Sequence, residues 1–373
     1  MSKSTKTIIW IVVILAIIGI WYSVAKNGDG EKTIKIGLLA PLSEKNISIG
    51  ADVRNAVELA LEQELANLEN IEIELVVEDT KCDPAEGVTG FTKLADIDNV
   101  QAIVGIVCSG VAEAIGPLAE EKNVPTLLSV AASYKPEKEA GWVFKFWPSN
   151  KDRANYEASF IVEDLGLKKI AVIHVNNAFG LGLKEEFEKK VGELGAEIVA
   201  LEAYNPEVTD FKTNLTKIKD ADLEALFIIA YEPAAINILK QAKELDLNTQ
   251  FLTLSTIISE SFLTSIGEIG EGLILDLPIT RSDQTDEFEK KFIARFEDKV
   301  LHPGTYFASD SIKILVEILK DTAERQKIKD RLYQVSTTGV SGKIEFDEFG
   351  INKKKNIFNM LQIKSGQFVP YED

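Results

Sequence analysis

Short apolar runs alternate with amphipathic runs along most of the chain. Ile34–Leu39 is typical of a buried strand, and Ala51–Leu68 places apolar residues three and four positions apart, as on one face of a helix. The alternation continues with a strand at Ile71–Val77, a helix at Phe91–Ile97 and a strand at Ala102–Val107. Such alternation indicates parallel sheets joined by right-handed crossovers, so we expect an α/β fold.

The same pattern occurs twice, which predicts two doubly wound lobes. Trp147–Asn150 separates the two series, because its Pro148 breaks any continuing element. The first series ends with a helix at Val111–Lys122 and strands at Val124–Leu128 and Val143–Phe146. The second series has strands at Ile170–His174, Glu197–Ala203, Leu226–Ala230 and Phe251–Leu254, and helices at Leu183–Glu193, Phe211–Ile218 and Ala234–Leu245.

The C-terminal part of the chain departs from this alternation. Two helices are predicted at Thr285–Lys299 and Ala308–Arg325. An antiparallel pair of strands is then predicted at Gly342–Phe346 and Asn356–Ile363, joined by Asp347–Gly350. A chain that returns to helices and then to strands is expected to add elements to both lobes.

An uncharged apolar run precedes the first strand. Thr7–Ala25 is long enough to cross the hydrocarbon layer, which takes about 20 residues of helix. Lys3 and Lys6 favour a cytoplasmic N-terminus, which would put the rest of the chain outside. A cleaved signal peptide ending at Ala25 is the alternative, although Trp21 suits an interfacial anchor. The run contains no Cys, which excludes a lipoprotein-type anchor.

Composition narrows the class of protein. The net charge of −18 disfavours nucleic acid as a partner, because binding to phosphates needs a basic face. Templates for catalysis are also missing from the sequence: it has no G-x-S-x-G, no H-E-x-x-H and no phosphate-binding G-x-x-x-x-G-K-[ST]. Gly180–Gly182 gives a lone G-x-G without the third glycine of a dinucleotide loop. We therefore expect neither an enzyme nor a cofactor.

Cys82 and Cys108 are the only cysteines of the sequence. In an exported chain an even count of two suggests one disulfide, whereas in a cytosolic protein they would be two buried thiols. A metal site is not expected, because the isolated His174 and His302 complete no ligand spacing.

Polar residues follow two neighbouring strands of the first series. Ser109 comes after the strand at Ala102–Val107, and Ser129 and Ala131–Ser133 come after Val124–Leu128. Ligands gather at the carboxyl ends of parallel strands, and a helix start with free N–H groups attracts anions. Capping of the helix alone is the alternative. Phe179 and Tyr231 follow strands of the second series, either as an aromatic wall facing these residues or as ordinary packing.

Five segments in order along the chain resemble the substrate-binding proteins of branched-chain amino-acid ABC transporters, the Leu/Ile/Val-binding family of type I periplasmic binding proteins. They are 34–64, Glu78–Pro84, Val107–Ser109, Ala171–Leu183 and Tyr231–Pro233. The resemblance implies two lobes joined by a three-segment hinge that close on a ligand. It implies that residues 33–148 and 279–335 form the first lobe and that 149–278 and 336–373 form the second. It also implies a Cys82–Cys108 disulfide. Residues 1–32 would precede the lobes as a membrane anchor or signal segment and a linker.

The resemblance assigns residues to the ligand site. Ser109 and Ser133 would hold a ligand carboxylate, and Ala132 would offer its backbone. Phe179 and Tyr231 would form the wall of the second lobe, and Ile49 would line the cleft. In amino-acid binders of this family an acid after the Phe251–Leu254 strand pairs with the ligand ammonium, but here Ser255 falls at or near that position. Either Glu260 reaches in, or the ligand is not a standard α-amino acid.

The function expected from the resemblance is that of an extracytoplasmic receptor. It would capture a small carboxylate-bearing ligand, such as an amino acid, and deliver it to the permease of an ABC importer. It would work at the outer face of the cytoplasmic membrane, anchored by its N-terminal helix. The ligand-sensing ectodomain of a signalling protein is the alternative, and it would need a second membrane crossing or a cytoplasmic output module.

Overall fold

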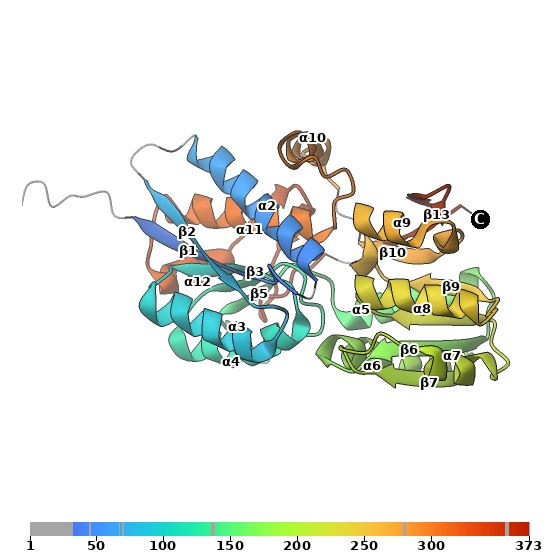
Figure 1. Ribbon diagram of the computed structural model, residues 1–373. Coiled ribbons are helices and arrows are strands. Elements are labelled where there is room, and N and C mark those ends of the chain that lie inside the picture. Colours follow the sequence, from blue (N-terminus) through green and yellow to red (C-terminus); the bar gives the residue numbers. More distant parts are fainter. Residues whose placement is uncertain are drawn as a thin grey trace, which may run out of the picture.

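The protein consists of two α/β lobes that lie side by side (Figure 1). The computed structural model describes residues 33–44, 46–66, 68, 71–135, 139–278, 281–354 and 358–372. Each lobe has its own sheet and its own apolar core, which we use to define the first and second lobe. The predicted α/β fold with parallel sheets is therefore confirmed.

The sheet of the first lobe is parallel throughout, in the order β2-β1-β3-β4-β5. Its helices cover both faces, with α2 packed on α11 on one side and α3 on α4 on the other (Figure 1). The strands are β1 (Ile34–Ala40), β2 (Ile73–Asp79), β3 (Ala102–Ile106), β4 (Thr126–Leu128) and β5 (Val143–Lys145). The helices are α2 (Ile47–Leu65), α3 (Pro84–Thr92), α4 (Ser109–Lys122), α10 (Thr285–Phe296), α11 (Gly304–Leu319) and α12 (Arg325–Leu332).

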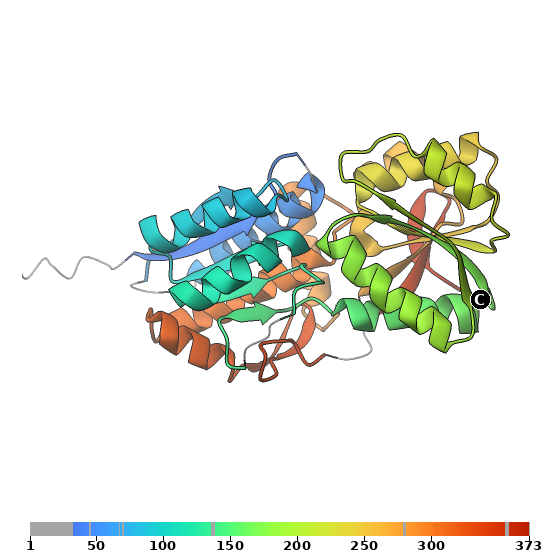
Figure 2. The same ribbon diagram turned by 90° about the horizontal axis from the view of Figure 1, so that it is seen from below.

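The sheet of the second lobe has the order β14-β13-β10-β9-β8-β6-β7. Helices α5 and α6 pack together on one face, and α7, α8 and α9 on the other (Figure 2). The parallel strands are β6 (Lys169–Val175), β7 (Glu197–Tyr204), β8 (Ala225–Ile229), β9 (Gln250–Thr253) and β10 (Ile274–Pro278). The helices are α5 (Asn150–Ser159), α6 (Ala178–Glu193), α7 (Lys212–Lys219), α8 (Glu232–Glu244) and α9 (Glu260–Ile266).

Strand β13 (Phe358–Lys364) extends the second sheet as the antiparallel neighbour of β10, and β14 (Gln367–Pro370) pairs antiparallel with β13 at the edge. The predicted pairing of Gly342–Phe346 with Asn356–Ile363 is therefore wrong. Residues Gly342–Glu345 form β12, which pairs instead with β11 (Ser336–Gly339) in a short hairpin. The sequence of β11 is polar and does not resemble a strand, and all three of its side chains, on Ser336, Thr337 and Thr338, are exposed.

The chain passes between the two cores three times. Trp147 belongs to the first core and Ala154 to the second. The third boundary, predicted after Val335, differs from the packing. Val340 and Ile344 are buried in the first core, and the chain enters the second core only at Met360. The β11–β12 hairpin is therefore part of the first lobe.

The predicted membrane anchor at Thr7–Ala25 lies outside the described residues. Among the helices that the structure describes, none combines the length and the apolar character needed to span a membrane.

The predicted disulfide between Cys82 and Cys108 is present, across a sequence separation of 26. Cys82 follows β2, and Cys108 is the residue that immediately precedes α4. The bond therefore ties the loop after β2 to the start of the helix whose first residue is Ser109.

Candidate ligand-binding site

Five of the predicted ligand-binding residues line one small cavity between the lobes. Its volume is about 20 Å³, which is close to the room that one water molecule needs. Residues Val107, Val130 and Thr256 complete the wall together with three residues that the sequence did not single out, Trp147, Arg153 and His302. The predicted residues that meet here are Ile49, Ser109, Ala132, Phe179 and Tyr231.

The first lobe contributes the start of α4 and the loop after β4. Ser109 is the first residue of α4, so its hydroxyl lies beside backbone N–H groups that have no acceptor within the helix. Its Oγ accepts a hydrogen bond from the Ser133 N–H at 3.2 Å, which joins helix and loop. The loop is also held by Lys145, whose buried Nζ donates to the carbonyls of Ala132 and Tyr134. This corner of the cavity is thus fixed and favours a negative charge.

The second lobe contributes an aromatic wall. The rings of Phe179 and Tyr231 stack with their centroids 5.2 Å apart and their planes at 26°. Phe179 lies in the first turn of α6, and Tyr231 immediately precedes α8. Burial raises the pKa of Tyr231 to about 12, so its hydroxyl keeps its proton at neutral pH. The wall therefore offers two apolar faces and one hydroxyl.

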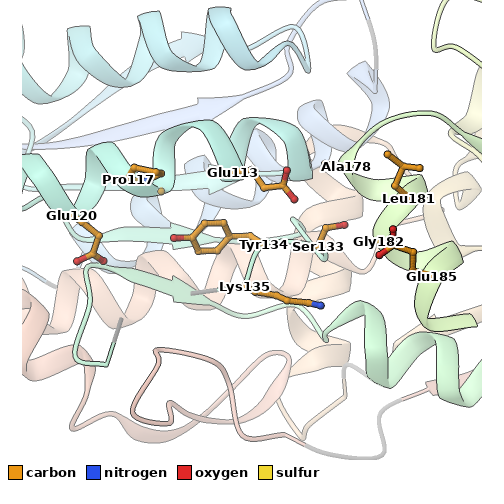
Figure 3. Close-up of a pocket in the computed structure, with 11 residues that line it drawn as sticks. Glu113, Pro117, Glu120, Ser133, Tyr134, Lys135, Ala178, Leu181, Gly182 and Glu185 are labelled. Atoms are coloured by element: carbon orange, nitrogen blue, oxygen red, sulfur yellow. The ribbon is translucent and has the colours of Figure 1, made fainter. Parts of the chain in front are cut away.

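Ser133 points to a different space. Its Oγ accepts a hydrogen bond from Asn150 Nδ2 at 2.8 Å, and the residue lines a larger hollow of about 640 Å³ between α4 and α6 (Figure 3). Three glutamates and one lysine line this hollow: Glu113, Glu120, Glu185 and Lys135. The excess of carboxylates disfavours a ligand carboxylate there, so we assign the ligand to the smaller cavity.

Ser255 lies behind Arg153 and does not line the cavity. Its Oγ accepts a hydrogen bond from Arg153 Nη2 at 2.7 Å. Arg153 also forms a bidentate pair with Asp276, with Nε–Oδ2 and Nη2–Oδ1 distances of 2.7 and 2.6 Å. Glu260, the other candidate for binding an ammonium group, is exposed on the first turn of α9 and is not part of the wall.

His302 and Trp147 stack on each other in the wall, with centroids 5.7 Å apart and planes at 9°. His302 Nδ1 accepts a hydrogen bond from the Gly304 N–H at 3.0 Å, so Nε2 carries the proton of the neutral ring. Burial, with a smaller effect of the Arg153 charge, lowers the pKa of His302 to about 3 and keeps the ring neutral. Both His302 Nε2 and Trp147 Nε1 are buried and have no hydrogen-bond partner among the described residues.

The three additional residues had weak signals in the sequence. Trp147 lies in Trp147–Asn150, which the pattern marked only as a boundary, and Arg153 follows that segment. Their position at the crossing between the lobes indicates that they could line the ligand site, because ligand pockets occur preferentially at interfaces between domains. His302 comes from a loop far along the chain, and nothing in its neighbourhood connects it to the other residues before folding. Within the described ranges no group of three His, Cys, Asp or Glu side chains could hold a metal ion.

Two lobes of parallel sheets, with a polar and aromatic cavity at the strand ends between them, define a solute-binding protein. The periplasmic binding protein family model matches residues 33–366, and the chain belongs to that family. That family groups the chain with the extracytoplasmic binding proteins.

Relatives and solved structures cover nearly the whole chain. A leucine-, isoleucine-, valine-, threonine- and alanine-binding protein of Pseudomonas aeruginosa is 26% identical over 361 residues, 94% of each chain. The branched-chain amino acid transporter substrate-binding protein LivJ of Streptococcus pneumoniae, solved with isoleucine, superposes with a TM-score of 0.82 at 23% identity, covering 90% of this chain and 98% of its own. A solute-binding protein of R. palustris, solved with benzoate, has the same TM-score at 20% identity, with coverage of 91% and 95%.

Proposed function

We propose that the protein captures a small carboxylate-bearing solute between its lobes. The observation that carries the proposal is the convergence of Ser109 and Ala132 with the stacked rings of Phe179 and Tyr231 in one cavity. The start of α4 suits a carboxylate, and the rings suit an apolar body of modest size. Relatives that carry amino acids and a neighbour that binds benzoate all hold carboxylates of this size, which supports the proposal.

Capture would proceed by closure of the lobes about the three crossing segments. A cavity with room for one water molecule cannot admit a solute unless the lobes separate. Few polar contacts oppose separation. Ser48 donates to Glu232 across the gap at 3.3 Å, and Lys135 pairs with Glu186 at 3.3 Å. The lysine of the Lys135–Glu186 pair is exposed, so this pair contributes little stability, and ligand contacts in the closed form can decide the equilibrium.

The loaded receptor would deliver its solute to the permease of an ABC importer. The apolar run Thr7–Ala25 supports a retained anchor on the outer face of the cytoplasmic membrane. A short polar linker, Lys26–Lys32, would then keep the binding lobes close to the permease.

Substitution of Ser109 by alanine tests the carboxylate pocket. We expect Ser109→Ala to weaken binding of the cognate carboxylate by about tenfold or more, because a hydrogen bond to a charged group contributes about 1.5–3 kcal/mol. Binding is measured by isothermal titration, and folding by thermal unfolding without ligand. Ser129→Ala is the matched control, because that buried hydroxyl lies outside the cavity and has no partner among the described residues. Unchanged affinity in Ser109→Ala would count against the proposed pocket.

A further inference from the structure

The charge of the cavity restricts the class of ligand, provided that the proposed carboxylate receptor is correct. Arg153 lines the second-lobe side and is only 1% exposed. Its Nε and Nη2 atoms bind Asp276 and Ser255, whereas Nη1 has no hydrogen-bond partner in the part of the chain that the structure describes. The sequence analysis did not identify a residue to bind a ligand ammonium group, and the cavity has the cationic guanidinium of Arg153 on this side.

The carboxylate of Asp276 is not available to a ligand. Oδ1 accepts from Arg153 Nη2 at 2.6 Å and from the Ser255 N–H at 2.7 Å, and Oδ2 accepts from Arg153 Nε. Asp276 is fully buried behind the guanidinium and is not part of the cavity wall. Glu157 is also buried nearby, and burial followed by the charge of Asp276 raises its pKa well above the ordinary value, which favours the neutral form of this carboxyl.

The described residues that line the cavity include no Asp or Glu. Asp52 lies just behind His302 and accepts a hydrogen bond from its backbone N–H at 3.2 Å. Burial, together with the charge of Asp298, raises the pKa of Asp52 to about 8, so this group is largely protonated at neutral pH. An ammonium group in the cavity would thus lose its water without gaining a carboxylate partner, which is costly.

Two further donors also lack partners. His302 Nε2–H and Trp147 Nε1–H belong to cavity residues, and both atoms are buried without a hydrogen bond in the described structure. A buried donor without a partner costs about 1–3 kcal/mol, and a ligand oxygen would remove that cost. Arg153, His302 and Trp147 therefore offer hydrogen-bond donors to the ligand. The ammonium group of an amino acid also only donates, so it could not pair with them.

We propose that the ligand is a carboxylate without an ammonium group that carries an oxygen acceptor beyond its carboxylate, as in 2-oxo acids. Its carboxylate binds at Ser109 and the start of α4, and its second acceptor faces Arg153, His302 and Trp147. Phe179 and Tyr231 enclose the apolar part between them. A matched pair that differs only at the α-carbon distinguishes this class from amino acids.

The test is isothermal titration of the purified protein with matched sets of acids. Each set contains an L-amino acid, its 2-oxo acid and its unsubstituted acid, with the side chains of alanine, leucine and phenylalanine; benzoate is added as an aromatic acid. We expect an acid without an ammonium group to bind at least tenfold more tightly than its amino acid. An amino acid that binds as tightly as, or more tightly than, its partners overturns this inference and leaves the receptor function intact. Binding of no member overturns both.

Substitution of Trp147 by phenylalanine tests the donor directly and keeps the ring stack. We expect Trp147→Phe to weaken binding of the preferred acid five- to tenfold. The amino acid of the same set should lose less, so the ratio between the two should shrink. Trp142→Phe is the control, because Trp142 is equally buried in the first lobe but lies outside the cavity. An unchanged ratio in Trp147→Phe would contradict the assigned role of the donor.

Discussion

At the level of single residues, the cavity combines residues whose position could be predicted from the sequence with residues whose position could not. Ser109, Phe179 and Tyr231 stand next to strand ends, so a rule about parallel sheets is enough to bring them together. Arg153 and His302 meet only because a helix after the first crossing and a loop before α11 fold onto the same space. The proposed ligand class rests on these two residues more than on the predictable ones.

The protonation of Asp52 gives a prediction at this scale. Its pKa rises from 3.8 to about 8 on folding, so between these values the folded state binds more protons than the unfolded state. Stability therefore falls as the pH rises from about 4 to about 8, by at most about 1.4 kcal/mol per pH unit from this group. Asp52→Asn removes that dependence.

Urea unfolding of the wild type and Asp52→Asn at half-unit intervals from pH 5 to 8 measures the difference. The variant should gain stability relative to the wild type as the pH rises. Groups common to both proteins cancel in the comparison. A difference that is constant over this range would show that Asp52 is ionised in the folded state.

At the level of helices and strands, local pattern predicted most of the parallel core. The strands before β11 contain β-branched or apolar runs that can be recognised in the sequence, and the helices between them carry apolar faces. The β11–β12 hairpin was missed because Ser336–Gly339 is polar and mostly exposed. Tertiary packing determines that β11 pairs with β12, and the same packing places Val340 and Ile344 in the first core.

The disulfide at the start of α4 gives a prediction at this scale. A bond that closes a loop of 26 residues is expected to contribute about 3 kcal/mol. The double variant Cys82→Ala/Cys108→Ala should lower the free energy of unfolding by that amount. Because Cys108 precedes Ser109, the double variant should also weaken carboxylate binding.

Urea unfolding and titration of the double variant test both parts of this prediction. The wild type in reducing buffer serves as a second measurement of the same bond. Equal stability of the oxidised wild type and the double variant would show that packing alone fixes the start of α4.

For the whole molecule, the contact between α6 and the first lobe limits how closely the lobes can approach. A Cβ on Gly182 would lie 3.1 Å from Asn150 Nδ2 and 3.3 Å from Ser133 Oγ, which is tighter than ordinary contact. Ser133 belongs to the first lobe, so a side chain at position 182 would hold the lobes apart. Gly182→Val should therefore reduce ligand affinity at least tenfold, with little change in the unfolding of the ligand-free protein.

Gly192→Val is the matched control for this wedge. Gly192 lies in the same helix, and a Cβ there would meet nothing within 4 Å. The two variants make the same Gly-to-Val change in helix propensity within one helix, so the contact between the lobes is the main difference. Small-angle scattering with saturating ligand should show a smaller contraction in Gly182→Val than in the control. Equal contraction and equal affinity in the two variants would show that a side chain at position 182 does not hold the lobes apart.

The small volume of the cavity also sets a kinetic limit. With room for about one water molecule, the cavity can exchange its solute only during excursions in which the lobes part. The apparent association rate is then the diffusional rate multiplied by the open fraction, and it reaches a plateau at the opening rate when solute is abundant. Stopped-flow traces would show this plateau as a saturating rate. A solute that leaves by the same route has a residence time set by the hinge, so turnover per receptor depends on how often the two lobes come apart.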